Sequence, residues 1–159
     1  MKIMVVTPYF SPKIGGLESY ALNLSQELKA QGNEVFIVTS NHLAQKRAEE
    51  TIQGLRVTRL PVLFNLWNTP VNPLWYFSLR KIIKREKPDI INAHSPVPFM
   101  ADMAILASGK THTTLTYHAA TLEKDGSTIF SIIAKIYGFL QKPSFRKASS
   151  IVAVSQYVK

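Results

Sequence analysis

The sequence predicts an α/β protein with a Rossmann-like parallel sheet and helices on both of its faces. Short apolar segments alternate with longer segments of helical spacing along the 159 residues. Most of the short segments are apolar throughout, as strands are when a parallel sheet is buried on both faces. Glycine, histidine or serine residues follow four of these segments, and ligands of such sheets bind beyond the carboxyl ends of the strands. A binding site is therefore expected at that edge.

The first third of the chain predicts a strand, a helix and a second strand. Residues 3–6 form the first strand, residues 7–16 form a loop with two prolines, and Leu17 begins the helix. The apolar stripe of this helix consists of Leu17, Ala21, Leu24 and Leu28. Gly32 stands where helices commonly end in a left-handed residue, and residues 35–39 form the second strand.

The middle of the chain predicts an exposed segment, an outer strand and a second helix. Residues 41–54 are polar and charged, which favours an exposed loop or a short helix. Residues 55–60 alternate apolar and basic side chains, like a strand near the edge of a sheet. Residues 61–73 are rich in proline, asparagine and aromatic residues and predict an irregular surface loop. Residues 74–87 resume helical spacing, and Pro88 closes that helix.

The remainder of the chain predicts three strands and two helices. The strands are residues 90–93, 113–117 and 150–154, and the helices are residues 98–108 and 129–140. Ser155 follows the last strand and resembles the cap of a further helix. No internal repeat is visible, so residues 1–159 predict one Rossmann-like domain.

The composition indicates a folded, cytoplasmic domain. Hydrophobic residues make up 46% of the chain and charged residues 18%, which is ordinary for a globular α/β domain. No cysteine occurs, so disulfides and thiolate zinc sites are excluded, and a reducing compartment is the default. No secretory signal or membrane-spanning segment is recognised. The formal net charge of +9 favours contact with an anionic lipid, nucleotide or nucleic acid without choosing among them.

Gly15 and Gly16 lie at the turn between the first strand and the first helix. Without a Cβ, their backbone N–H groups can approach a ligand closely, and the positive end of the helix suits an anion such as a diphosphate. The alternative is that the pair only relieves backbone strain in a tight turn. Neither the Walker pattern nor the pattern of three spaced glycines is present, so the ATPase and dehydrogenase interpretations lose their main support.

Two of the four histidines end predicted strands, namely His94 and His118. An imidazole at such a position could hydrogen-bond a sugar hydroxyl or stabilise a developing charge, and the alternative is a structural hydrogen-bonding role. His42 and His112 have no comparable placement and are expected to be solvated loop residues. No Asp-x-Asp pair and no His-Glu-x-x-His pattern occurs, so no metal site is predicted.

The helix expected over residues 74–87 combines aromatic and basic side chains. One interpretation is an interfacial helix that lies against an anionic membrane. The candidate membrane-surface residues are Trp75, Arg80, Lys81, Lys84 and Arg85. The alternative is a helix that packs on the sheet and exposes its lysines to solvent. Nucleic acid is not expected as a partner, because no nucleic-acid module is recognised and the basic residues lie away from the strand ends.

The glycine loop, the two strand-end histidines and the last strand form an ordered set of motifs. The set consists of Pro8-Tyr9-Phe10-Ser11-Pro12 with Gly15-Gly16-Leu17-Glu18, then Pro88-Asp89-Ile90-Ile91-Asn92-Ala93-His94, Thr116-Tyr117-His118-Ala119 and Ile151-Val152-Ala153-Val154-Ser155. In this order and at these spacings it resembles the N-terminal domain of the retaining GT-B glycosyltransferases of family 4. The resemblance covers essentially the whole chain.

The resemblance implies roles for the residues at the strand ends. His118 corresponds to the catalytic position beside the transferred sugar. The candidate binding residues for the donor diphosphate and the acceptor are Gly15, Gly16, Glu18, His94, Ser95 and Ser155. Of these, His94 and Ser95 are expected to line the same cleft as His118.

The resemblance also implies an activity. Such enzymes transfer a sugar from a nucleotide-sugar donor to a glycan or lipid-linked acceptor, with retention of configuration and without a required metal or other cofactor. Their C-terminal domain holds the nucleotide, so residues 1–159 are expected to be the acceptor-side half and to be inactive alone. Attachment to the inner face of the cell membrane is a further hypothesis. A non-catalytic Rossmann-like binding or interaction domain is the alternative.

Overall fold

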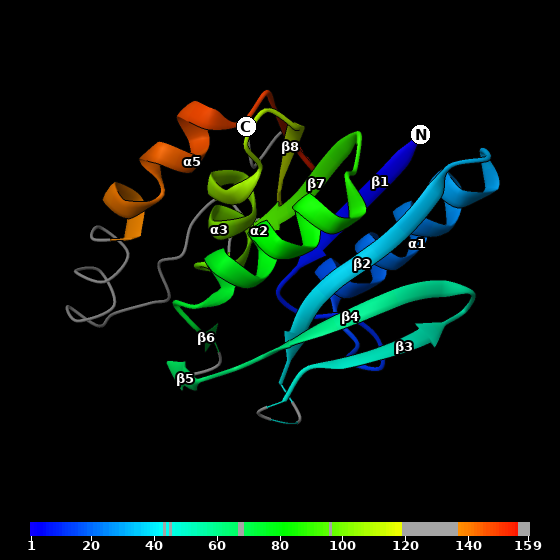
Figure 1. The fold of residues 1–159 in the computed structure, drawn as a ribbon, viewed down its shortest axis with the longest axis horizontal. Coiled ribbons are helices and arrows are strands. Elements are labelled where there is room, and N and C mark those ends of the chain that lie inside the picture. Colours follow the sequence, from blue (N-terminus) through cyan, green and yellow to red (C-terminus); the bar gives the residue numbers. More distant parts are fainter. Residues whose placement is uncertain (43, 45, 67–68, 96, 119–136, 156–159) are drawn as a thin grey trace.

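The computed structural model describes all residues except 43, 45, 67–68, 96, 119–136 and 156–159, and so leaves out most of the helix expected over residues 129–140. Within the described part, a seven-stranded sheet forms the centre (Figure 1). Its strands are β1 (Lys2–Thr7), β2 (Glu34–Asn41), β3 (Ala48–Ile52), β4 (Leu55–Pro61), β7 (Ile90–Ser95), β8 (His112–Tyr117) and β9 (Ser150–Ala153). A separate pair of strands is β5 (Phe64–Leu66) and β6 (Thr69–Val71). The helices are α1 (Gly16–Ala30), α2 (Trp75–Glu86), α3 (Met100–Ala107) and α5 (Lys142–Lys147), and residues 137–140 are also helical.

The topology confirms the Rossmann-like α/β expectation. The strand order is β3-β4-β2-β1-β7-β8-β9, and every neighbouring pair is parallel except β3 with β4. From β1 the chain builds outward to β2 and β4, and it then returns to place β7 on the other side of β1. Open sheets of this kind bind ligands where the strand order reverses. The expected site therefore lies at the carboxyl ends of β1 and β7.

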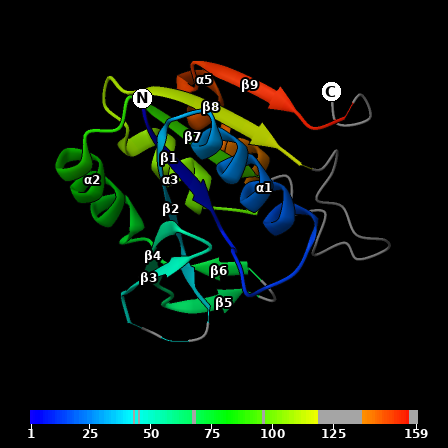
Figure 2. The same cartoon turned by 90° about the vertical axis from the view of Figure 1, so that its right-hand side faces the viewer.

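Helices bury both faces of the sheet, with α1 on one face and α2 and α3 on the other (Figure 2). Successive side chains of β1 alternate between the two cores. Met4 and Val6 pack in the core that includes α2 and α3, whereas Ile3 and Val5 pack in the core that includes α1. Burial on both faces explains why this strand is apolar throughout.

Helix α1 buries a more polar face than its sequence predicts. Of the expected stripe, Ala21 is buried and Leu28 packs against the core, whereas Leu17 and Leu24 are only partly buried and lie outside that core. The buried residues of the helix are Glu18, Ala21 and Ser25. The Ser25 hydroxyl donates a hydrogen bond to the Ala21 carbonyl at 2.6 Å, so it has a partner within its own helix. A buried polar residue with a local partner leaves no apolar signal in the sequence.

Two segments that were expected to be irregular contain strands. Part of residues 41–54 forms β3, which pairs antiparallel with β4 at the edge of the sheet. An edge strand exposes most of its side chains, so β3 is polar, and Glu50 forms an ion pair with Arg59 of β4. Within residues 61–73, β5 and β6 pair as an antiparallel hairpin. The expectation of irregular structure is therefore wrong in both places, because backbone pairing here occurs without an apolar pattern.

An ion-pair network joins the amino ends of the strands to the end of α2. The Glu86 carboxylate accepts hydrogen bonds from Arg56 at 2.8 and 2.9 Å and from Lys2 at 3.0 Å. Lys2 also pairs with Glu34 at 3.1 Å. These contacts, above all that with Arg56, hold the pKa of Glu86 well below its usual range. The network stabilises the sheet at the edge opposite the expected site.

Trp75 belongs to the core and does not lie on the outer face of α2. Its side chain is completely buried, and its Nε1–H donates to the Pro61 carbonyl at 2.8 Å. Trp75 shares the inner face of the helix with the buried residues Leu79 and Ile82, four and seven positions further along. The assignment of Trp75 to a membrane surface is therefore wrong, because the helical phase directs it towards the sheet.

Replacing Trp75 by alanine is expected to destabilise the fold strongly. The change removes a large buried side chain and its hydrogen bond, so the free energy of unfolding should fall by about 3–5 kcal/mol. Phe77→Ala is the matched control on the same helix, because Phe77 is 68% exposed. That control should change the free energy of unfolding by about 0.5 kcal/mol or less. Chemical denaturation measures both values, and equal losses would contradict the core assignment.

Candidate functional site

Two histidines meet at the carboxyl ends of β7 and β8. His94 is the last residue but one of β7, and His118 directly follows β8. The backbone N–H of His118 donates to the Ser95 carbonyl at 2.9 Å, which extends the pairing of the two strands. The Nδ1 of His94 lies 2.9 Å from the Nε2 of His118, and the two rings stack with 28° between their planes. The parallel strands thus bring both histidines to one place.

A tyrosine of α1 packs against this histidine pair. The centroid of the Tyr20 ring lies 4.9 Å from that of His118 and 5.9 Å from that of His94, with the rings edge to face. Tyr20 follows Gly16 by four residues, so the two share one face of the helix. The first turn of α1 and the histidine pair therefore border the same part of the sheet edge. That four-residue spacing is the signal by which Tyr20 could have been found in the sequence.

Burial keeps both imidazoles neutral. His94 is completely buried, and this desolvation, with a smaller contribution from His118, lowers the pKa of His94 to about 3. Desolvation also lowers the pKa of His118. No carboxylate among the described residues contributes to either shift. At neutral pH the pair therefore consists of two uncharged rings that share one hydrogen bond.

Gly15 directly precedes α1 and Gly16 is its first residue, and the two glycines have different surroundings. Neither has a positive φ, and Gly15 has an extended backbone with φ −179°, so relief of strain does not explain the pair. A Cβ on Gly15 would overlap the carboxylate of Glu18, which folds back over the beginning of the helix. A Cβ on Gly16 would meet nothing within 4 Å. Gly16 therefore borders open space at the positive end of α1, where an anionic group can approach the backbone.

Some of the expected binding residues do not face open space. His94 is 0% exposed and Ser95 is 1% exposed, so the expectation that they line the cleft directly is wrong. The Ser95 side chain hydrogen-bonds Tyr137, whose phenol donates to the Asp102 carboxylate at 2.6 Å. Long-range packing behind the strand ends therefore buries them. Ser155 is exposed after β9, two strands away from β7, and the helix that it was expected to cap lies outside the described residues.

A second group of side chains gathers beyond the carboxyl ends of β1 and β2. The Nδ1 of His42 is buried, and the His42 ring meets that of Tyr9 edge-on at 5.7 Å. The Nζ of Lys13 lies 3.1 Å from the centroid of the Tyr9 ring. Burial, followed by the charges of Lys13 and Arg59, lowers the pKa of His42. His42 lies in a turn, as expected, but it is only partly exposed, because β2 runs beyond its expected end to Asn41 and carries His42 to the sheet edge.

Metal binding has no candidate centre in the part of the chain that the structure describes. There, no group of three or more histidine, aspartate or glutamate side chains is placed to hold a metal ion. His112 is exposed at the beginning of β8, at the opposite edge of the sheet from His118. The expectation that the reaction needs neither a metal nor another cofactor stays a prediction.

The buried His94 is expected to make the fold sensitive to mild acid. Its pKa is about 3 in the folded chain and about 6.5 in an unfolded chain, so the unfolded state binds the additional proton as the pH falls. The contribution of the neutral His94 to stability is therefore fully present near neutral pH. The free energy of unfolding should fall by about 2 kcal/mol between about pH 6.5 and about pH 5. His94→Asn, which removes the titrating group, should show a shallower decline. Urea unfolding over this pH interval measures both slopes, with His112→Asn as the exposed control, and equal slopes for wild type and His94→Asn would contradict the prediction.

Comparison with known proteins identifies the family. The family model described as Glycosyltransferase Family 4 matches residues 14–159. One component of the human phosphatidylinositol N-acetylglucosaminyltransferase is 35% identical over 106 residues, which are 65% of this chain and 22% of that protein. The phosphatidyl-myo-inositol mannosyltransferase of Mycolicibacterium smegmatis is 21% identical over 159 residues, which are all of this chain and 39% of that protein. The chain thus spans well under half the length of these relatives.

Solved structures show the same fold. The crystal structure of MurG from Acinetobacter baumannii superposes with a TM-score of 0.63 and 16% identity, over 99% of this chain and 43% of that chain. At this identity the likeness shows the fold alone, which is the Rossmann-like half of a GT-B glycosyltransferase. Because the family model matches nearly the whole chain and the fold agrees with it, the protein belongs to glycosyltransferase family 4.

Proposed function

We propose that this chain is the acceptor-side, N-terminal domain of a retaining glycosyltransferase that transfers a sugar from a nucleotide-sugar donor to a glycan or lipid-linked acceptor. The observation that carries the proposal is the histidine pair beside the open start of α1, at the point where the strand order reverses. The names of both relatives include a phosphatidylinositol, which supports a lipid-linked acceptor. Retention of configuration is included because it is the stereochemistry expected of family 4.

Two features of the site would contribute to the reaction. The backbone N–H groups and the positive end of α1 beside Gly16 would stabilise the negative charge that develops on the leaving diphosphate. This contribution supports transfer without a required metal ion. His118, which burial keeps uncharged, would hydrogen-bond the transferred sugar rather than act as a charged acid.

The other half of the cleft belongs, in this proposal, to a C-terminal domain of the same parent chain. The region shared with this chain makes up 22% and 39% of the two relatives. A domain that holds the nucleotide would close over Gly16 and His118 and fix the donor in a reactive orientation. Without it, residues 1–159 would lack the positioning that transfer requires, so we propose that the isolated chain is inactive.

Replacing His118 by alanine in the complete enzyme is expected to lower kcat by about 100-fold, because one hydrogen bond to the reacting sugar is lost. His112→Ala is the matched control, since His112 is exposed at the other edge of the sheet and should leave kcat unchanged. Transfer is measured with a panel of nucleotide sugars, and the isolated 159-residue chain is expected to give none. Unchanged turnover in His118→Ala would contradict the role proposed for His118, and absence of transfer by the complete protein would favour a non-catalytic binding domain.

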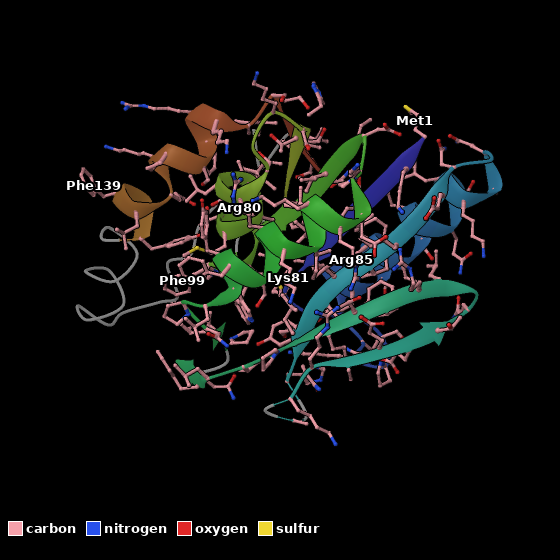
Figure 3. All side chains as sticks on the ribbon, in the orientation of Figure 1. Met1, Arg80, Lys81, Arg85, Phe99 and Phe139 are labelled. Atoms are coloured by element: carbon pink, nitrogen blue, oxygen red, sulfur yellow. The ribbon has the colours of Figure 1, made fainter. Side chains whose placement is uncertain are left out.

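We also propose that α2 contacts an anionic membrane surface, so that the enzyme works in the cytoplasm at the inner face of the cell membrane. Figure 3 shows Arg80, Lys81 and Arg85 along this helix. An open pocket on its outer side is lined by Tyr76, Phe77, Arg80, Lys81 and Lys84. Aromatic and cationic side chains in this combination favour the interface of an anionic bilayer.

The basic side chains of α2 differ in whether they already bind another group of the protein. Arg80 donates to the Ala107 carbonyl at 3.1 Å, and Arg85 pairs with Glu86 at 2.8 Å. Lys81 and Lys84 are exposed and have no ion pair within the described residues, so they are the stronger candidates for headgroup contact. In the part that the structure describes, no helix has the length and apolarity needed to cross a bilayer.

Reversing the charge of Lys81 and Lys84 together is expected to weaken binding to anionic vesicles strongly. The double change to glutamate replaces attraction by repulsion, so binding should fall by at least about 10-fold, given about 1 kcal/mol per basic residue near the surface. Lys46→Glu with Lys142→Glu is the control, because both lysines are exposed, lie outside α2 and change the net charge equally. Flotation with anionic and neutral vesicles measures the effect. Wild-type binding to neither kind of vesicle would remove the membrane proposal.

A further inference from the structure

His94 lies directly behind His118 and hydrogen-bonds it through its ring. The Nδ1 of His94 is 2.9 Å from the Nε2 of His118. The second nitrogen of His94, Nε2, is buried and has no hydrogen-bond partner among the described residues. An apolar side chain would fill this space without leaving a buried polar atom unpaired, so packing alone does not explain a histidine here.

The neutral state of the pair limits where its protons can be. Burial lowers the pKa of both rings, that of His94 to about 3, so each ring carries a single N–H at neutral pH. The hydrogen bond between the two rings needs one donor and one acceptor. Either His94 donates from Nδ1, or His118 donates from Nε2.

The unpaired Nε2 of His94 distinguishes these two arrangements. If His118 donates, His94 must carry its proton on Nε2, which would then be a buried N–H without an acceptor among the described residues. If His94 donates from Nδ1, its Nε2 is left only with an unpaired lone pair. Orphaned N–H groups are rarer in protein interiors than under-satisfied acceptors, so donation from His94 is favoured.

We propose that His94 is a positioning residue that donates from Nδ1 to His118 and thereby fixes the tautomer of His118. Because the Nε2 of His118 accepts this bond, His118 carries its own proton on Nδ1. No hydrogen-bond acceptor for the Nδ1–H of His118 lies among the described residues. This N–H is available to a hydroxyl oxygen of the transferred sugar, so this inference rests on the function proposed above.

The surroundings hold the His118 ring in this orientation. Its backbone N–H is bound to the Ser95 carbonyl at 2.9 Å, and the Tyr20 ring packs edge-on at 4.9 Å. The titratable groups that face the pair are the two imidazoles and the Tyr20 phenol, and within the described residues no acidic or basic side chain outside the pair shifts the pKa of either ring. The pair therefore offers an uncharged N–H donor near neutral pH, without the carboxylate that would be needed to stabilise an imidazolium.

Three substitutions at position 94 separate control of the tautomer from packing. An asparagine amide can place an N–H near the position of Nδ1, so His94→Asn keeps a donor to His118. An aspartate places an acceptor there, so His94→Asp makes His118 donate from Nε2 and raises the pKa of His118 through its negative charge. His94→Leu fills the space and provides no hydrogen bond.

NMR of the ¹⁵N-labelled 159-residue chain provides a readout that does not depend on activity. The chemical shifts of the ring nitrogens tell protonated from unprotonated atoms. In the wild-type chain and in His94→Asn, we expect His118 to be protonated on Nδ1 and not on Nε2, and in His94→Asp the reverse. A wild-type His118 protonated on Nε2 overturns the proposal. If His94→Asp does not fold, the wild-type spectrum decides.

Sugar transfer by the complete enzyme tests the consequence of this positioning. His94→Leu should lower kcat by about 10-fold to 100-fold with little change in KM, and His94→Asn should recover most of the loss. Equal kcat in wild type and His94→Leu, in an enzyme that His118→Ala impairs, overturns the proposal. If His118→Ala leaves transfer unchanged while the spectra show the expected tautomer, the catalytic role of His118 fails and the positioning by His94 stands.

Discussion

Burial of β1 on both faces is the constraint on which the rest of the structure depends. A strand whose side chains alternate between two cores needs a helical layer on each side. The chain meets this need by placing β2 on one side of β1 and β7 on the other, with α1 and α3 on opposite faces. The connections after β1 and β7 leave in different directions, so the sheet edge between them stays accessible. The position of the site thus follows from the way the core is built.

The side chains at the amino ends of the strands are charged and paired, whereas the histidines at the carboxyl ends are uncharged. At the amino ends of the strands, Glu86 stays ionised between Arg56 and Lys2, and these contacts tie α2 to the sheet. At the carboxyl ends, burial of His94 and His118 is not offset by a carboxylate among the described residues, so both rings stay uncharged. The ion pairs of Glu86 therefore lie at the opposite end of the strands from the histidine pair.

The sequence was sufficient for features that depend on local pattern. The strands β1 and β2 are buried on both faces and appear as apolar segments, and His94 and His118 are predictable neighbours because both end parallel strands. Features that depend on distant partners were not predictable in this way. The polar strand β3 exists because β4 pairs with it, and the complete burial of His94 comes from packing behind the sheet. The directions of Trp75 and Tyr20 follow from the spacing within their helices and were within reach of the sequence.

Gly15 and Glu18 compete for one volume at the beginning of α1. A side chain at position 15 would overlap the Glu18 carboxylate, and Glu18 is only 8% exposed, so it has little room elsewhere. The two positions are therefore not free to diverge independently during evolution. A residue larger than glycine at position 15 requires the Glu18 side chain to move or to be shorter, so variation in this helix start should be correlated between the two sites.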